Sequence, residues 1–196
     1  GAAVHPPDPR RPFEGHRPAG HHAERDRGLG FCIFSNAVLA AMHARDVFGV
    51  ERIAIVDWDV HHGNGTQWAF YDDPTVLTVS VHQDGRFPTD TGGLAERGDG
   101  DGFGANINIP LMPGCGHGAY VATFERVVVP ALDRFAPELI IVASGYDAGG
   151  FDAMAHMMCH SGTFAAMAAM MVDVADRCCQ GRLVVLHEGG YSPFHV

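Results

Sequence analysis

Short apolar runs that alternate with segments of helical spacing constrain the fold of this chain more than any other sequence feature. The runs that predict strands occupy residues 52–57, 75–82, 106–110, 138–143 and 183–186. Helical spacing, with Ser35 as the expected N-cap of the first segment, covers residues 37–45, 118–135 and 162–178. Strands that alternate with helices predict an α/β fold, a mainly parallel sheet sandwiched by helices.

The composition indicates one folded domain and narrows the classes of partner. The chain has 196 residues, of which 46% are hydrophobic, enough for a real core. Its net charge of -10 disfavours a general nucleic-acid binder but is compatible with a cationic substrate. The five cysteines include no C-x-x-C pair and are expected to be reduced. The chain shows neither a signal-peptide pattern nor a membrane-spanning apolar stretch, so we predict a cytoplasmic protein without a membrane partner.

Two segments are predicted to lack regular structure. Residues 1–15 should be an irregular lead-in, and the irregular backbone should continue to residue 20, because prolines disfavour a helix there. These prolines are Pro6, Pro7, Pro9, Pro12 and Pro18. Residues 84–104 form a long loop rich in Gly and Asp, and its length makes it a candidate functional segment.

Polar side chains follow the apolar runs at the points where the strands should end. They are Asp57, Asp59, His61, His82, Asp147 and the motif Glu188-Gly189-Gly190-Tyr191. Alternate residues of a strand face the same side, so Asp57, Asp59 and His61 should point the same way. Ligands of parallel sheets bind beyond the carboxyl ends of the strands, so this convergence predicts a functional site there.

Asp59, His61 and Asp147 are the candidate metal ligands at this site. Carboxylates and imidazoles bind zinc, and a catalytic zinc takes three protein ligands and leaves one position for water. For Asp59 and His61 alone the simpler interpretation is a surface hydrogen bond, so the assignment depends on Asp147 at a second strand end. Together the three indicate a metal-assisted hydrolase.

The adjacent histidines His21 and His22 follow a glycine and are candidates for proton transfer to and from a water activated by the metal. A neutral histidine needs a partner that fixes its tautomer, and Asp57 and Asn64 are the candidate partners. The alternative is a solvated pair in a polar loop.

Three aromatic residues are candidates for contacts with a substrate. Tyr191 follows two glycines and could donate its hydroxyl to a developing oxyanion, although a core tyrosine near a turn fits equally. Phe31 and Phe87 lie next to turn residues and could line an apolar slot, although aromatic residues are more often part of a core.

Cys32 is predicted to be a buried structural thiol. The chain contains no nucleophile-elbow, phosphate-loop or dinucleotide motif, which disfavours a serine hydrolase.

Five motifs together resemble a known family. They are Arg-Pro-Ala-Gly-His-His-Ala (17–23), Gly-Phe-Cys-Ile-Phe-Ser-Asn (30–36), Val-Asp-Trp-Asp-Val-His-His-Gly-Asn-Gly-Thr (56–66), Gly-Tyr-Asp-Ala-Gly (145–149) and Glu-Gly-Gly-Tyr (188–191). In this order the chain resembles the zinc-dependent histone deacetylase family, including bacterial acetoin-utilisation and acetylpolyamine amidohydrolase-like members. The resemblance covers nearly all of the chain from residue 15 onward and implies the arginase/deacetylase-like fold.

The resemblance implies a role for each candidate residue. Zinc would be bound by Asp59, His61 and Asp147; general acid–base catalysis would involve His21 with Asp57 and His22 with Asn64; Tyr191 would polarise the substrate carbonyl; and Gly30, Phe31, Phe87 and Gly189 would line a tunnel for the acyl-lysine-like chain. Some relatives carry Asp at the position of Asn64. Asn64 and Trp58 together resemble the residues of the class II branch of the family.

The resemblance also implies monovalent cations near the zinc. A potassium ion would be held by Asp57, Asp59, His61, Ser80 and Val81. A second monovalent site would fall near Phe70, Asp73 and Val76. The related two-metal ureohydrolases would need further carboxylates beyond His61 and Asp147, where this chain has Gly63 and Gly149. A single metal is therefore favoured.

The expected function is zinc-dependent hydrolysis of an acyl amide, most simply an acetyl group on lysine, a polyamine or another small amine. Family domains are longer, so we interpret residues 16–196 as a partial catalytic domain that is incomplete at both ends. An open sheet edge would then make self-association plausible.

The alternatives to the hydrolase function are a zinc- and acyl-binding remnant that does not turn over and, less favoured, a binuclear ureohydrolase. The style of the motifs is bacterial, which makes histones the least expected substrate.

Overall fold

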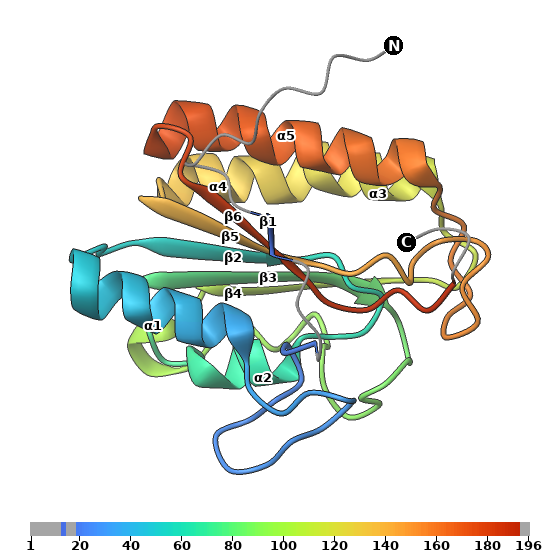
Figure 1. The fold of residues 1–196 in the computed structure, drawn as a ribbon, viewed down its shortest axis with the longest axis horizontal. Helices are drawn as coiled ribbons and strands as arrows, with labels where there is room; N and C mark the ends of the chain where they lie inside the picture. Colours follow the sequence, from blue (N-terminus) through green and yellow to red (C-terminus); the bar gives the residue numbers. More distant parts are fainter. Residues whose placement is uncertain (1–12, 15–18, 193–196) are drawn as a thin grey trace.

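A single parallel sheet with helices on both faces organises the chain in the computed structural model, which describes residues 13–14 and 19–192 (Figure 1). The strand order is β1-β6-β5-β2-β3-β4, and every neighbouring pair is parallel. The strands are β1 (Phe13–Glu14), β2 (Ile53–Asp57), β3 (Val76–Gln83), β4 (Asn106–Leu111), β5 (Leu139–Ser144) and β6 (Leu183–His187). The helices are α1 (Asn36–Phe48), α2 (Asn64–Ala69), α3 (His117–Thr123), α4 (Val129–Phe135) and α5 (Ser161–Cys179). The predicted parallel α/β fold is therefore confirmed.

The central strands are buried on both faces, which explains why their sequences are continuous apolar runs. Along β2, Ala54 and Val56 face a core formed with α3, α4 and α5, while Ile53 and Ile55 face a second core formed with α1. Figure 1 shows the same division, with α3, α4 and α5 on one face of the sheet and α1 and α2 on the other.

The register of the central strands brings their carboxyl ends to one edge. Asp57 at the end of β2 lies opposite Ser80 of β3 and Ala143 of β5. The segments that follow β2 and β5 therefore leave the sheet side by side, as predicted from the polar residues at the strand ends.

The segment from 117 to 135 differs from the single regular helix predicted for 118–135. It is helical throughout, but a π-helical segment, Phe124–Val128, separates α3 from α4. Pro130 lies in the first turn of α4 and has no N–H to donate to the preceding turn. The missing donor gives a physical reason for the widened backbone at this point.

Two short elements were absent from the sequence-based prediction. Within the stretch expected to be irregular, residues 13–14 form β1, which pairs with β6 at Val185 and Leu186. The other lead-in residues, 1–12 and 15–18, lie outside the described part of the chain. Helix α2 begins at Asn64, in a Gly-Asn-Gly stretch with little helix propensity. No helix among residues 13–14 and 19–192 is long and apolar enough to cross a membrane.

We expect Ile141→Ala to destabilise the fold by about 2–5 kcal/mol, because it removes a fully buried side chain between β5 and α1. Leu39→Ala, on the half-exposed side of α1, is the control and should change stability by less than about 0.5 kcal/mol. Equilibrium denaturation of both variants checks this. Equal stability losses would contradict the assignment of Ile141 to the core.

Candidate metal centre

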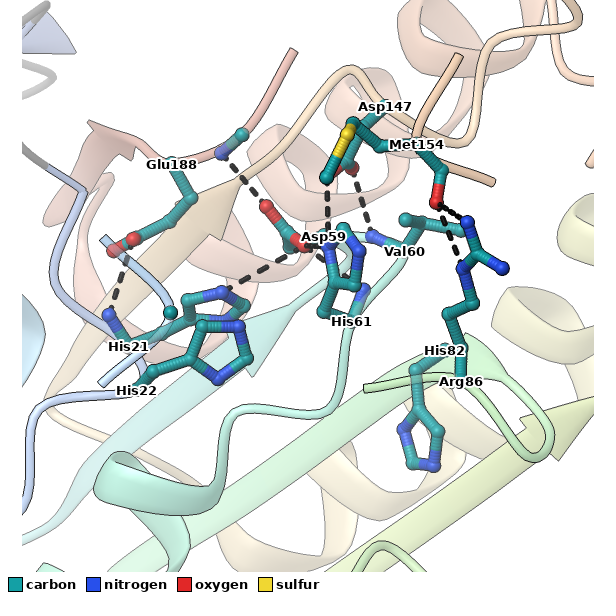
Figure 2. Close-up of polar contacts among 12 residues, drawn as sticks. His21, His22, Asp59, Val60, His61, His82, Arg86, Asp147, Met154 and Glu188 are labelled. Carbon is teal, nitrogen blue, oxygen red and sulfur yellow. Dashed lines mark hydrogen bonds and ion pairs between the residues drawn. The ribbon is translucent and has the colours of Figure 1, made fainter. Parts of the chain in front are cut away.

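Asp59, His61 and Asp147 come together beyond the ends of β2 and β5. Their potential ligand atoms all lie within 4.8 Å of one another, and all three residues are buried. His61 Nδ1 lies 3.0 Å from Asp59 Oδ1 and 3.0 Å from Asp147 Oδ2 (Figure 2). Among the residues that the structure describes, this is the one group of three or more such side chains placed to share a metal ion.

The electrostatics of this cluster suit a cation. Burial, followed by repulsion from Asp59, raises the pKa of Asp147 to about 7. Burial opposes charge on His61 as well, but the Asp147 and Asp59 carboxylates beside its ring outweigh it and raise its pKa to about 9. Asp147 Oδ2 is buried without a well-directed hydrogen bond, because one ring N–H cannot satisfy both carboxylates. A metal ion between the three side chains would neutralise the two carboxylates and satisfy that oxygen.

Glycines and backbone N–H groups hold the two carboxylates in place. Gly189 N–H donates to Asp59 Oδ2 at 2.7 Å, and Val60 N–H donates to Asp147 Oδ1 at 2.9 Å. A Cβ atom at Gly189 would lie 2.3 Å from Asp147 Oδ2, and one at Gly145 would lie 2.3 Å from Asp59 Oδ2. Only residues without a side chain therefore allow the surrounding loops to approach the cluster this closely.

The two adjacent histidines lie beside this cluster, each with the predicted partner. His21 Nδ1 lies 2.8 Å from Asp57 Oδ2, and His22 Nδ1 lies 2.8 Å from Asn64 Oδ1. The His21 and His22 ring centroids are 4.0 Å apart, and both residues are buried. His21 Nε2 is 3.6 Å from Asp59 Oδ1, which links the pair to the candidate ligands.

The environments of the two histidines drive their pKa values in opposite directions. Burial alone would lower the pKa of His21, but the Asp57 and Asp59 carboxylates outweigh it and raise the pKa well above its usual value. For His22, burial and the neighbouring His21 lower the pKa to about 2. These opposite directions favour a charged imidazole at His21 and a neutral one at His22, which is the arrangement expected of a paired acid and base.

One of the aromatic candidates lies against the histidine pair, and the other two contact each other at the exposed surface. Phe87 packs edge-on against His22, with ring centroids 5.0 Å apart, and Phe31 packs against Tyr191 at 6.3 Å. Phe31 is 72% exposed and Tyr191 is 37% exposed, so neither belongs to the core. Gly30 has a positive φ of 52°, and a Cβ there would lie 2.3 Å from the His22 ring.

The residues expected near monovalent cations lie in two places. Asp57, the last residue of β2, is paired in register with Ser80 of β3, and Asp59, His61 and Val81 lie close to this pair in the sequence. Phe70, Asp73 and Val76 form a turn, in which Asp73 N–H donates to Phe70 O and Val76 N–H donates to Asp73 O. Cys32 is buried, and burial raises the pKa of its thiol to about 11, which fits the predicted structural role.

Two buried carboxylates near the site had no predicted role. Glu188 Oε2 accepts N–H groups of Gly20 at 2.6 Å and His21 at 3.1 Å (Figure 2). Asp152 Oδ2 accepts N–H groups of Tyr191 at 2.7 Å and Ser192 at 3.1 Å. Glu188 lies in one of the quoted motifs, which is a signal for its importance, whereas nothing in the sequence around Asp152 indicates this contact.

Comparisons with known proteins give consistent matches over most of the chain. A model of the histone deacetylase domain matches residues 4–196. A histone deacetylase-like amidohydrolase of Pseudomonas aeruginosa is 52% identical over 92% of this chain and 47% of its own length. A probable deacetylase of Archaeoglobus fulgidus is 41% identical over 90% of this chain and 48% of its own length. The crystal structure of the HDA15 HD domain superposes with a TM-score of 0.84 at 37% identity, covering 90% of this chain and 49% of that one. The chain thus spans about half the length of these relatives.

We expect Gly189→Ala to weaken binding of Zn²⁺ by about tenfold or more, because the new methyl group would displace the Asp59 and Asp147 carboxylates. Gly118→Ala, on α3 with open space around the new atom, is the matched control and should bind like the parent chain. Competition against a chromophoric chelator measures both affinities. Unchanged affinity in Gly189→Ala would contradict a metal site at this cluster.

Proposed function

Because the chain belongs to the histone deacetylase family, we propose that it hydrolyses an acyl amide, in the first instance an acetyl amide, with one zinc ion. One observation carries this proposal: a buried Asp-His-Asp cluster lies beside two histidines whose pKa values are driven apart. A cation site next to an acid–base pair is what hydrolysis of an unactivated amide needs.

Asp59, His61 and Asp147 would hold the zinc ion. Carboxylate and imidazole donors in a set of three suit zinc, and no further carboxylate occupies positions 63 or 149, which supports one metal rather than two. When bound, zinc would supply Lewis acidity that polarises the substrate carbonyl and makes a water more acidic.

The two histidines would move the protons. His22 Nδ1 is engaged with Asn64, so its Nε2 is the atom that would take a proton from the attacking water and return it to the leaving amine. His21 is hydrogen-bonded to Asp57, which favours its charged form, so it would be the acid of the pair and would stabilise negative charge that develops on the substrate. Glu188 would keep both rings in place through the backbone of Gly20 and His21.

The rim residues would bind and orient the substrate. Tyr191 would donate its hydroxyl to the substrate carbonyl oxygen, with its backbone fixed by Asp152. Gly30, Phe31, Phe87 and Gly189 would line the path of the acyl-bearing chain. Potassium at Asp57, Asp59, His61, Ser80 and Val81, with a second monovalent cation near Phe70, Asp73 and Val76, completes the proposed set of ions.

An acetylated lysine, an acetylpolyamine and other small amides are the proposed substrates. A side-chain or polyamine amine on a flexible stem suits a site whose aromatic rim is open to solvent. The acidic net charge of the chain favours cationic substrates of this kind. The alternative function is binding of zinc and an acyl ligand without turnover.

The direct test is release of acetate from an acetyl-lysine peptide and from an acetylpolyamine by the zinc-loaded chain. Tyr191→Phe should lower kcat by about 10²–10³-fold, because it removes one oxyanion donor. Turnover that is equal in both proteins would contradict the role of Tyr191. A folded, zinc-occupied chain that releases no acetate would support the binding-only alternative.

Alanine at Asp59, His61 or Asp147 should abolish zinc uptake, since each removes one of three ligands and leaves the other buried charges unpaired. Asp46→Ala, on the exposed side of α1, is the control and should retain the zinc content of the parent chain. Metal content after dialysis gives the answer by elemental analysis. Full zinc occupancy in any of the three variants would show that the ligand assignment is wrong.

A further inference from the structure

The segment that carries the two histidines is attached to the start of α2 by backbone contacts. Gly65 N–H and Thr66 N–H both donate to His21 O, at 3.0 Å and 3.3 Å. A Cβ atom at Gly65 would lie 2.2 Å from Ala23 O, so only glycine allows this approach. These contacts hold Asn64 against the His22 ring whatever the orientation of its side-chain amide.

The Asn64 amide lies between two side chains of different chemistry. Its Oδ1 is 2.8 Å from His22 Nδ1, and its Nδ2 donates to Glu24 Oε1 at 2.7 Å. An amide oxygen only accepts hydrogen bonds and an amide nitrogen only donates them. The orientation of this amide therefore decides whether His22 Nδ1 carries a proton.

Glu24 can fix the orientation of the Asn64 amide. Its carboxylate accepts two hydrogen bonds from Arg27, from Nε to Oε2 at 2.9 Å and from Nη2 to Oε1 at 3.0 Å. The hydrogen bond from Arg27 lowers the pKa of Glu24. At neutral pH the side chain is therefore a carboxylate, which accepts hydrogen bonds and cannot donate them. The amide atom that faces Glu24 must then be the nitrogen, which leaves the oxygen for His22.

We propose that Glu24 is a positioning residue that fixes the tautomer of His22 through Asn64, an inference that rests on the proposed function. With the Asn64 oxygen toward the ring, the proton is held on Nδ1 and Nε2 keeps its lone pair. Without Glu24 the amide can turn over and offer its nitrogen to Nδ1, which places the proton on Nε2. In that tautomer the ring cannot accept a proton at the atom that would serve the reaction.

The tautomer can be read directly by nitrogen NMR of metal-free protein labelled with ¹⁵N-histidine, because protonated and bare ring nitrogens resonate far apart. A spectrum of His22→Gln identifies the His22 signals. Glu24→Met removes the acceptor at similar size and should convert the single Nδ1–H form of His22 into a mixture. Glu24→Gln keeps an acceptor oxygen and should retain the Nδ1–H form. Glu125→Met, exposed on the far helical segment, is the matched control.

Exchanging the amide and the carboxylate provides a second test. Asn64→Asp alone would face one carboxylate with another at 2.7 Å and should lower the melting temperature. Combining it with Glu24→Gln restores a donor–acceptor pair of the same size, so the double variant should melt higher than Asn64→Asp and show the Nδ1–H form.

The outcomes separate this inference from the proposed function. A pure Nδ1–H form in Glu24→Met, or a double variant no more stable than Asn64→Asp, would overturn the role of Glu24. A tautomer shift in a chain that never releases acetate would support the positioning role and count against the deacetylase. If the chain is active, Glu24→Met should lower kcat by about tenfold or more while Glu24→Gln keeps most of the activity.

Discussion

Two carboxylates, Asp59 and Asp147, are buried within a few ångströms of each other, and the loops around them are arranged to make this possible. Neither group can be ionised there at little cost unless positive charge or directed N–H groups surround it. His61 supplies a ring between them, and the backbone of Val60 and Gly189 supplies one donor each. One oxygen of Asp147 is left without a hydrogen-bond partner, which makes the cluster compatible with a bound cation.

Other buried side chains hold the neighbouring loops in the same way, through hydrogen bonds to the backbone of those loops. Glu188 fixes the start of the histidine loop, and Asp152 fixes the backbone of Tyr191. Arg86 donates to Met154 O and Gln83 accepts from His156 N–H, which attaches the segment around residue 155 to the end of β3. Functional side chains on loops are thus positioned by hydrogen bonds from the sheet and from neighbouring loops, and they need no regular secondary structure of their own.

The strands that were predicted have a local sequence signature, whereas two of the missed elements depend on contacts with distant segments. Strands such as 53–57 could be recognised because burial on both faces demands a continuous apolar run. Helix α2 was missed because Asn64 and Gly65 disfavour a helix, and contacts with the backbone of His21 stabilise it instead. Strand β1 depends on pairing with β6, from the opposite end of the chain, and has no local signature. The π-helical segment could be anticipated only by asking what Pro130 does inside a helix.

Residue types and their spacing were enough to predict the kind of chemistry and most of the residues proposed to perform it. The strand-end positions of Asp59, His61 and Asp147, the histidine pair with its partners Asp57 and Asn64, and the family motifs are all local features of residue type and spacing. How these groups act on one another follows from the packing of distant segments, including the opposite pKa shifts of His21 and His22 and the contacts made by Glu24, Glu188 and Asp152. The physical reason is that burial, distance and hydrogen-bond direction depend on which segments pack together, and a local pattern of residues does not encode them.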